Sequence, residues 1–249
     1  MDKKSSLKEY IQKHRYFALS QVVKDLGMER RLAKEYLFEL KQAGNVFDAG
    51  YGYYSSVAET FTFPKVSRIE SVRQFIKKQF PEVECVVWDT KIFAPFYHHT
   101  QTHHITFVEV EKDLVFDVHQ SLYAKFEAVQ QERRVRSALE AFDVTTNPIV
   151  VRKLFSRSPH EGAVPALEKI LVDMYVDLDR YNYIGQSDYL ELWREMIHSY
   201  RINIGHLVAY SKRRKCLRTL FLQLVDNKNS YATDFCQILN EIGKGQQGR

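Results

Sequence analysis

Carboxylates at strand-like positions are the first residues of this sequence that could do chemistry. Asp89 follows the apolar run of residues 83–88, and Glu109 and Glu111 lie two residues apart, just before Lys112. Alternate residues of a strand share a face, a geometry with which metal-dependent nucleotidyltransferases and nucleases hold Mg²⁺. Asp89, Glu109, Glu111 and Lys112 are therefore candidate catalytic residues.

The spacing of these residues argues against catalysis. A nucleotidyltransferase has a Gly-Gly or Gly-Ser turn before its carboxylate pair, and none precedes Glu109. A restriction-type nuclease has an acid two residues before its lysine, where this sequence has Val110. Dinucleotide-binding, phosphate-loop, serine-hydrolase and zinc-protease motifs are also missing. We expect solvent-facing strand ends or an ion pair with Lys112, no enzyme, and no metal or cofactor.

Four histidines form a second group, His98-His99 and His103-His104. Adjacent histidines point in different directions, so at most one of each pair could join a common zinc site. No Cys or Asp completes the set nearby, and a polar loop is the favoured interpretation.

Two charged groups occur in helical sequence near the end of the chain. Asp173 and Asp177 are spaced i, i+4 beside Glu168 and Lys169, which is typical of a solvated helix face. The strongest basic run follows later, and its cations could contact phosphate or an acidic partner, or simply lie at a solvated helix end. This basic run consists of Lys212, Arg213, Arg214, Lys215 and Arg218.

The first 56 residues predict a winged helix. Leu7, Tyr10, Ile11 and His14 form one helical stripe, and a second short helix spans about residues 20–26. A third helix spans residues 29–43, and its apolar face consists of Leu32, Tyr36, Leu37, Leu40 and Ala43. Residues 46–54 then predict a small β-hairpin around a glycine-containing turn. In a helix-turn-helix with a wing, the second helix of the pair lies in the major groove.

The polar face of the helix over residues 29–43 is the candidate reading face. Arg31 and Lys34 in its first turns would contact bases, since arginine can bind guanine through two hydrogen bonds. Arg30, Lys41 and the hairpin residues Tyr51 and Tyr53 would contact the DNA backbone. Glu35 on the same face would repel the phosphates of DNA, so a protein-interaction module remains an alternative.

The rest of the chain predicts a second, larger domain. After a linker at residues 57–67, strands at about 83–88, 105–110 and from 149 alternate with helices, and the chain is helical after Pro165. The first two strands are nearly continuous apolar runs, which predict strands buried on both faces. The helix after the second strand is predicted from the stripe Val115, Val118, Leu122, Phe126 and Val129. The expected fold is α/β (α+β): an N-terminal winged helix, then residues 68–242 as a small α/β sheet with a C-terminal helical bundle. The last residues, 243–249, are expected to fray.

Composition fits a soluble cytoplasmic protein of 249 residues. The formal net charge is +5, with both ends of the chain net basic and the middle net acidic, as expected if the flanks meet a polyanion. Three widely spaced cysteines, Cys85, Cys216 and Cys236, offer no disulfide framework. No apolar run is long enough for a membrane helix, so we expect no membrane partner.

Several motifs together resemble the antitoxins of AbiE-type (type IV) toxin–antitoxin systems and a related bacterial family of unassigned function. They are AGYGYY at 49–54, CVVWDT at 85–90, FVEVEKD at 107–113, VPALEKILVD at 164–173 and YRIN at 200–203, with the basic stretch after Tyr210. The resemblance reaches about residue 218. It implies a repressor that binds double-stranded DNA repeats at its own promoter and neutralises a nucleotidyltransferase-type toxin, without catalysis of its own. Its second domain would be similar to a reduced nucleotidyltransferase core.

Two other classes of function stay open from the sequence. One is a metal-dependent nucleotidyl- or phosphoryl-transfer enzyme centred on Asp89, Glu109 and Glu111, with the winged helix as a targeting module. The other is a protein-interaction adaptor without affinity for nucleic acid.

Overall fold

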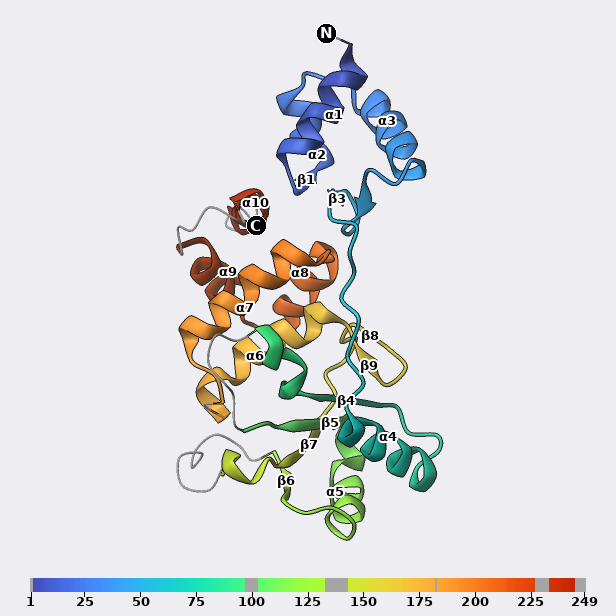
Figure 1. Ribbon diagram of the computed structural model, residues 1–249, viewed down its shortest axis with the longest axis vertical. Helices are drawn as coiled ribbons and strands as arrows, with labels where there is room; N and C mark the ends of the chain where they lie inside the picture. The colour runs from blue at the N-terminus through green and yellow to red at the C-terminus, as the bar shows by residue number, and fades with distance from the viewer. Residues whose placement is uncertain (1, 97–102, 133–142, 182, 227–232, 245–249) are drawn as a thin grey trace. The chain divides into compact units, whose positions relative to one another are not determined.

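The computed structural model describes residues 2–96, 103–132, 143–181, 183–226 and 233–244 (Figure 1). The chain is a mixed α/β protein, as the sequence predicts, and its internal contacts divide it into two compact units. Unit 1 combines Met1–Phe61 with Trp193–Arg249, and unit 2 is Thr62–Leu192. This division differs from the expected domain over residues 68–242, because the last helices pack against the N-terminal segment.

Unit 1 contains a small sheet, helices from the start of the chain and helices from its end. Its N-terminal elements are α1 (Lys3–Lys13), β1 (Tyr16–Ala18), α2 (Leu19–Asp25), α3 (Arg30–Gln42), β2 (Phe47–Asp48) and β3 (Tyr53–Ser55). Its C-terminal elements are the end of α7 (Gln186–Ser199), then α8 (Ile204–Arg213), α9 (Leu217–Asp226) and α10 (Thr233–Lys244). The sheet has the order β1-β3-β2 with antiparallel pairing throughout.

The predicted apolar stripes form the core of the N-terminal part of unit 1. Leu7 of α1, Val22 of α2 and Leu37 of α3 are buried together with Phe17 of β1. Helix α3 agrees with the prediction of residues 29–43 to within one residue at each end. Strand β1 was not predicted, because its three residues are all buried and show no alternation. Residues 56–66, which include most of the expected linker, form neither a helix nor a strand.

Unit 2 is built around a mixed sheet of order β4-β5-β7-β6. Its strands are β4 (Cys85–Asp89), β5 (Thr106–Val110), β6 (Val129–Gln131) and β7 (Ile149–Lys153), with a separate pair β8 (His160–Glu161) and β9 (Val164–Pro165). Its α-helices are α4 (Ser67–Gln79), α5 (Val115–Tyr123), α6 (Leu167–Tyr181) and the start of α7, and its 3₁₀ segments are η1 (Thr90–Phe96), η2 (Lys112–Leu114) and η4 (Val144–Thr146). Strand β4 is antiparallel to β5, whereas β5 and β6 are parallel to β7.

Helices cover both faces of this sheet (Figure 1). Helices α4 and α5 lie against one face, and α6 lies against the other. The apolar runs at 83–88 and 105–110 were predicted as strands buried on both faces, and β5 is buried at every position. Val129, which the helical stripe after Val115 included, instead begins β6. Among the described residues, none of the helices combines the length and the apolar character that a membrane crossing requires.

Candidate functional site

Helix α3 presents a polar outer face in unit 1. Ala33, Leu37 and Leu40 face the core, and the opposite side of the helix is exposed. We call this side the outer face; it consists of Arg30, Arg31, Lys34, Glu35 and Phe38. Phe38 is 61% exposed, which makes it one of the large apolar side chains left open to solvent. The outer face therefore has the exposure that a recognition surface needs.

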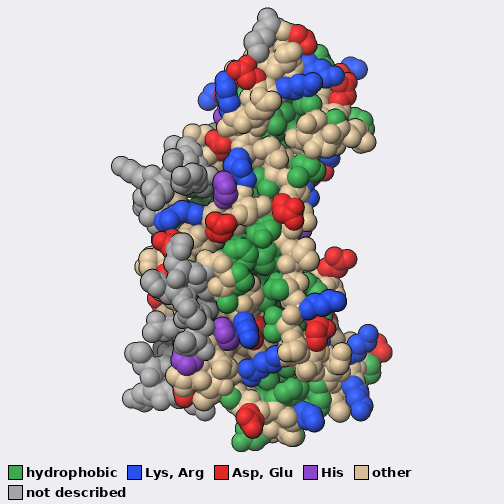
Figure 2. Space-filling model, viewed as in Figure 1, with side chains coloured by type: hydrophobic (Ala, Val, Ile, Leu, Met, Phe, Trp, Pro, Cys, Tyr) green, Lys and Arg blue, Asp and Glu red, His purple; other side chains and the backbone are tan. Residues whose placement is uncertain are grey.

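Ion pairs neutralise part of the charge around this face. Arg31 Nε lies 3.1 Å from Glu35 Oε1, one helical turn along the same helix. Lys41, predicted as a phosphate contact, is half-buried and lies 2.5 Å from Asp48 of β2. On the face shown in Figure 2, Lys and Arg side chains at the top of the view accordingly lie among acidic ones.

Two cations of the outer face lie outside these ion pairs. Arg30 and Lys34 are both exposed, and neither makes an ion pair with any residue that the structure describes. They lie four residues apart and therefore point to the same side of α3. Of the cations predicted to bind DNA, these two are the best placed for phosphate or guanine.

The turn between β2 and β3, residues 49–52, is the second exposed feature of unit 1. Tyr51 at its tip is 98% exposed, and the flanking Gly50 and Gly52 have φ angles of +114° and +78°. Such angles favour glycine, because a side chain there would be strained. Tyr53, the other predicted hairpin contact, begins β3 and is half-buried. The structure therefore offers Tyr51 to a partner more fully than Tyr53.

The basic run joins α8 to α9 in the same unit. Lys212 and Arg213 are in the last turn of α8, Arg214 follows as its C-cap, and Lys215 has a φ of +59°. Lys212, Arg213, Lys215 and Arg218 are exposed, whereas Arg214 is half-buried. The Arg213 guanidinium lies 5.9 Å from the centre of the Tyr210 ring.

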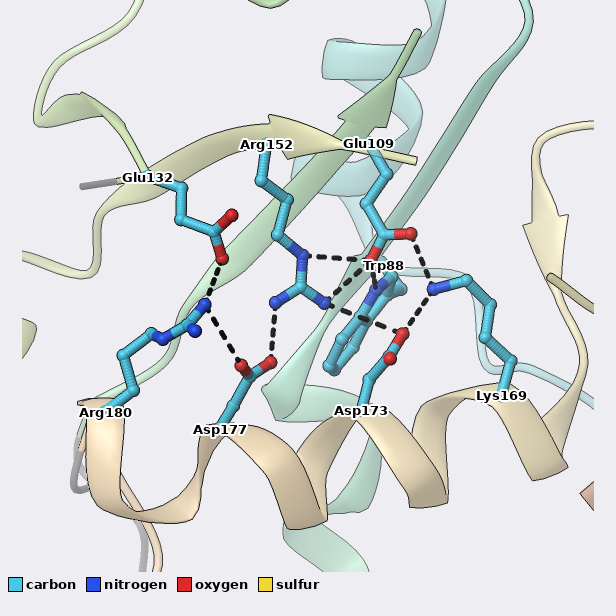
Figure 3. Close-up of polar contacts among 8 residues, drawn as sticks. All are labelled: Trp88, Glu109, Glu132, Arg152, Lys169, Asp173, Asp177 and Arg180. Carbon is cyan, nitrogen blue, oxygen red and sulfur yellow. Dashed lines mark hydrogen bonds and ion pairs between the residues drawn. The ribbon is translucent and has the colours of Figure 1, made fainter. Parts of the chain in front are cut away.

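A network of charged side chains is buried in unit 2 between the sheet and α6 (Figure 3). We call it the charge cluster; it consists of Glu109, Arg152, Lys169, Asp173 and Asp177. Each of these side chains is at most 3% exposed. Glu109 and Arg152 are paired across β5 and β7, and the other three follow one another at i, i+4 along α6. Glu132 and Arg180 form an ion pair at the edge of the cluster.

Ion pairs connect the whole charge cluster. Arg152 lies 2.7 Å from Glu109 and 2.5 Å from Asp177, while Lys169 lies 2.6 Å from Glu109 and 2.5 Å from Asp173. The indole N–H of Trp88 also donates a hydrogen bond of 3.1 Å to Glu109. The Arg152 guanidinium lies 4.1 Å from the centre of the Phe107 ring.

These contacts keep Glu109 and Arg152 charged in spite of their burial. Burial alone would raise the pKa of the Glu109 carboxyl, but the attraction of Lys169 and Arg152 outweighs burial and holds this pKa below its usual range. Burial likewise opposes the charge of Arg152, but Asp177 and Glu109 raise the pKa of Arg152 well above its ordinary value. The side chains form ion pairs with one another within the protein, and none of them is more than 3% exposed. The arrangement serves to join α6 to the sheet.

The prediction that Asp173 and Asp177 lie on a solvated helix face was therefore wrong. Asp173, Asp177 and Lys169 are fully buried, and Glu168 is 6% exposed. Ile170, Leu171, Val172 and Met174 are buried as well, so α6 is enclosed on all sides along this stretch. Apolar residues occur on nearly all the remaining sides of this stretch of α6, and this pattern in the sequence indicates a buried helix.

The structure does not bring the candidate catalytic residues together. Asp89 is paired with Thr106 and Glu109 with Val86, so the two carboxylates are on opposite faces of the sheet. Asp89 accepts hydrogen bonds from the Thr106 hydroxyl and the Lys91 backbone N–H, at 2.5 and 2.8 Å. The expectation that these strand carboxylates face solvent was wrong, since Asp89 and Glu109 are both 2% exposed.

Glu111 and Lys112 lie outside the strand. Strand β5 ends at Val110, so the i, i+2 relation between Glu109 and Glu111 no longer places them on one face. Glu111 precedes η2, Lys112 begins it, and both side chains are exposed. The expected ion pair of Glu109 with Lys112 is replaced by the pair with Lys169.

The histidine group is only partly described. His98 and His99 lie outside the described residues, whereas His103 and His104 are half-buried ahead of β5. Burial lowers the pKa of His104. Within the residues that the structure describes, no three His, Cys, Asp or Glu side chains are grouped so as to hold a metal ion.

A known protein family matches most of the chain. Residues 32–230 match a protein family that is described as a family of unknown function (DUF6577). No curated protein matches the chain.

Proposed function

The chain belongs to this family of unknown function, and we propose from its own geometry that it is a DNA-binding transcriptional regulator of the antitoxin type. In this proposal α1, α2 and α3 with the sheet β1-β3-β2 are a winged helix, α3 is the recognition helix and the β2–β3 turn is the wing. The observation that carries the proposal is the exposed outer face of α3, on which Arg30 and Lys34 make no ion pair with any described residue. Unpaired cations at the start of a recognition helix are suited to phosphate and to guanine.

The antitoxin part has a separate basis. The resemblance of the sequence to AbiE-type antitoxins supports repression of the protein's own promoter, neutralisation of a nucleotidyltransferase-like toxin and a cytoplasmic location. The enclosed charge cluster is consistent with a second unit that does not itself catalyse a reaction, since no substrate could reach Glu109.

DNA binding is tested by fluorescence anisotropy with a labelled duplex from the region upstream of the protein's own gene. We expect affinity to fall steeply with salt, and Arg30→Ala with Lys34→Ala to flatten the slope of log affinity against log salt by about two units. Lys77→Ala with Lys78→Ala removes the same charge from exposed positions of α4 in unit 2, and is the matched control. If no duplex binds even at low salt, the proposal is wrong.

A protein-interaction adaptor is the second candidate, and one observation favours it. Phe38 is 61% exposed at the C-terminal end of the outer face, where an apolar side chain would suit a protein partner better than DNA. An adaptor predicts that Phe38→Ala abolishes capture of a partner protein while low-salt DNA binding is absent from the start. The regulator predicts measurable DNA binding that Arg30 and Lys34 dominate.

A further inference from the structure

The β2–β3 turn is in direct contact with the start of α8, within unit 1. The backbone N–H of Ile204 donates a hydrogen bond of 2.7 Å to the carbonyl oxygen of Ala49. A Cβ atom on Gly50 would lie 2.7 Å from the backbone nitrogen of Gly205, closer than atoms can pack. Asn203, which accepts a hydrogen bond from the His206 N–H, caps the same end of α8. The turn therefore rests on a helix end, backbone against backbone.

The segment that leads into α8 contacts the neighbouring strands as well. We call residues 200–205 the α7–α8 connection. The Tyr16 hydroxyl of β1 donates to the carbonyl oxygen of Tyr200 at 2.8 Å and accepts from the Ile202 N–H at 2.9 Å. The guanidinium of Arg201 lies 4.7 Å from the centre of the Phe47 ring of β2. The connection thus touches β1, β2 and the turn.

Contacts other than the α7–α8 connection also hold the hairpin: β3 pairs with β1, and the backbone N–H of Leu19 donates a hydrogen bond of 2.9 Å to the carbonyl oxygen of Gly52. Strand β2 has two residues and β3 has three, and so short a hairpin is marginally stable without outside contacts. Tyr51 is almost fully exposed, so its own side chain does not hold the turn in place. Contacts from elsewhere must set where the turn points.

We propose that the α7–α8 connection positions the β2–β3 turn, so that the C-terminal helices determine how Tyr51 meets DNA. This inference rests on the proposed function. Arg201 and Gly205 are positioning residues in it, because they act on the turn and not on the DNA. Residues from the end of the chain are thereby part of the DNA-binding apparatus, although 155 positions separate Ala49 from Ile204.

A double-mutant cycle between Arg201 and Tyr51 tests the inference with the full chain and the labelled duplex. We expect Tyr51→Ala to weaken binding roughly tenfold, which corresponds to about 1.4 kcal/mol. In an Arg201→Ala background the same change should cost less than twofold, because the turn is already displaced. Arg201→Lys keeps a cation over Phe47 and should restore most of the affinity. Additive losses of affinity, or a failure of Arg201→Lys to restore affinity, would overturn the inference. Neither result would contradict the proposal that the protein binds DNA.

A comparison of alanine substitutions at Gly50 and Gly52 also tests whether the α7–α8 connection positions the turn. Gly50→Ala introduces both a strained φ and the collision with Gly205, whereas Gly52→Ala introduces a strained φ with no atom within 4 Å. We expect Gly50→Ala to lower DNA affinity at least fivefold more than Gly52→Ala, while equal losses would contradict the inference.

Hydrogen exchange measures positioning without DNA. The amide of Ile204 should exchange at least tenfold faster in Arg201→Ala and Gly50→Ala than in the wild type, and at the wild-type rate in Arg201→Lys. Unchanged exchange in Arg201→Ala and Gly50→Ala would overturn the inference even in a protein that binds DNA. If the wild type binds no duplex, the proposed function fails, and exchange still decides whether the connection holds the turn.

Discussion

Glu109 and Arg152 occupy paired positions on the parallel strands β5 and β7, and their side chains lie 2.7 Å apart in the interior of unit 2. Each also contacts α6, Glu109 through Lys169 and Arg152 through Asp177. One strand pair is thus joined to one helix at two points along its length. Glu109 and Arg152, which are far apart in the sequence, therefore lie at the centre of the charge cluster.

Glu109→Gln should therefore destabilise the fold strongly. It leaves Lys169 and Arg152 buried with one counter-charge fewer, and breaking a buried ion pair costs about 3–5 kcal/mol. Urea unfolding followed by circular dichroism at pH 7 measures the loss. Glu111→Gln removes the same charge two residues away from an exposed side chain and should change the free energy of unfolding by less than about 0.5 kcal/mol. Equal effects of the two changes would show that the cluster has no special role.

The difference between wild type and Glu109→Gln should depend on pH. The pKa of Glu109 is lower in the folded protein than its ordinary value of 4.5. As the pH falls, the unfolded chain therefore binds the proton first, so the stabilisation is complete above about pH 5 and is lost as the pH falls through the folded-state pKa. Unfolding free energies measured from pH 7 down to pH 3 should converge for the two proteins. A constant difference would argue against a charged Glu109.

Lys169 and Asp173 should behave as a coupled pair. They lie 2.5 Å apart on successive turns of α6, and both are fully buried. Lys169→Met and Asp173→Leu should each cost about 3–5 kcal/mol, because each leaves an uncompensated charge. The double variant should be more stable than the sum of the two losses predicts, by roughly 1–3 kcal/mol. Additive losses in denaturant unfolding would mean that the two side chains do not depend on each other.

The sequence predicted well those elements whose pattern is decided locally. The stripe Leu32, Tyr36, Leu37 and Leu40 fixed α3, and continuous apolar runs fixed β4 and β5. Strand β1 escaped prediction because its side chains are buried through contacts with β3 and α10, far away in the chain. Val129 has the spacing of the preceding helical stripe, yet pairing with Ile149 places it in β6.

The charge cluster shows why the candidate site could not be predicted in the same way. A carboxylate spaced i, i+4 from a lysine is common on exposed helices, and local spacing does not say whether the helix is covered. Burial of Asp173 and Asp177 follows from Arg152, which reaches α6 only once β7 has joined the sheet. Likewise, the opposite orientation of Asp89 and Glu109 depends on the register between β4 and β5, which neither strand specifies alone.

Tyr51→Ala should separate DNA binding from folding. Because the side chain is 98% exposed, its removal should change the free energy of unfolding by less than about 0.5 kcal/mol. Loss of one polar contact to DNA should weaken binding roughly tenfold. Tyr123→Ala, which truncates a 66% exposed tyrosine of α5 in unit 2, is the control and should leave anisotropy titrations unchanged. Unaltered binding by Tyr51→Ala would remove the β2–β3 turn from the interface.

The basic run should contribute charge to DNA binding and no sequence preference. Lys212, Lys215 and Arg218 are exposed in the same unit as α3, and flexible cations at a helix junction suit phosphate rather than base edges. Changing all three to glutamine should flatten the slope of log affinity against log salt by up to about three units, and competition between specific and random duplexes should give an unchanged affinity ratio. If the slope stays constant while capture of an acidic protein partner is lost, the run is a docking surface instead. A changed affinity ratio would mean that these side chains read bases, and the assignment of base recognition to α3 would then need revision.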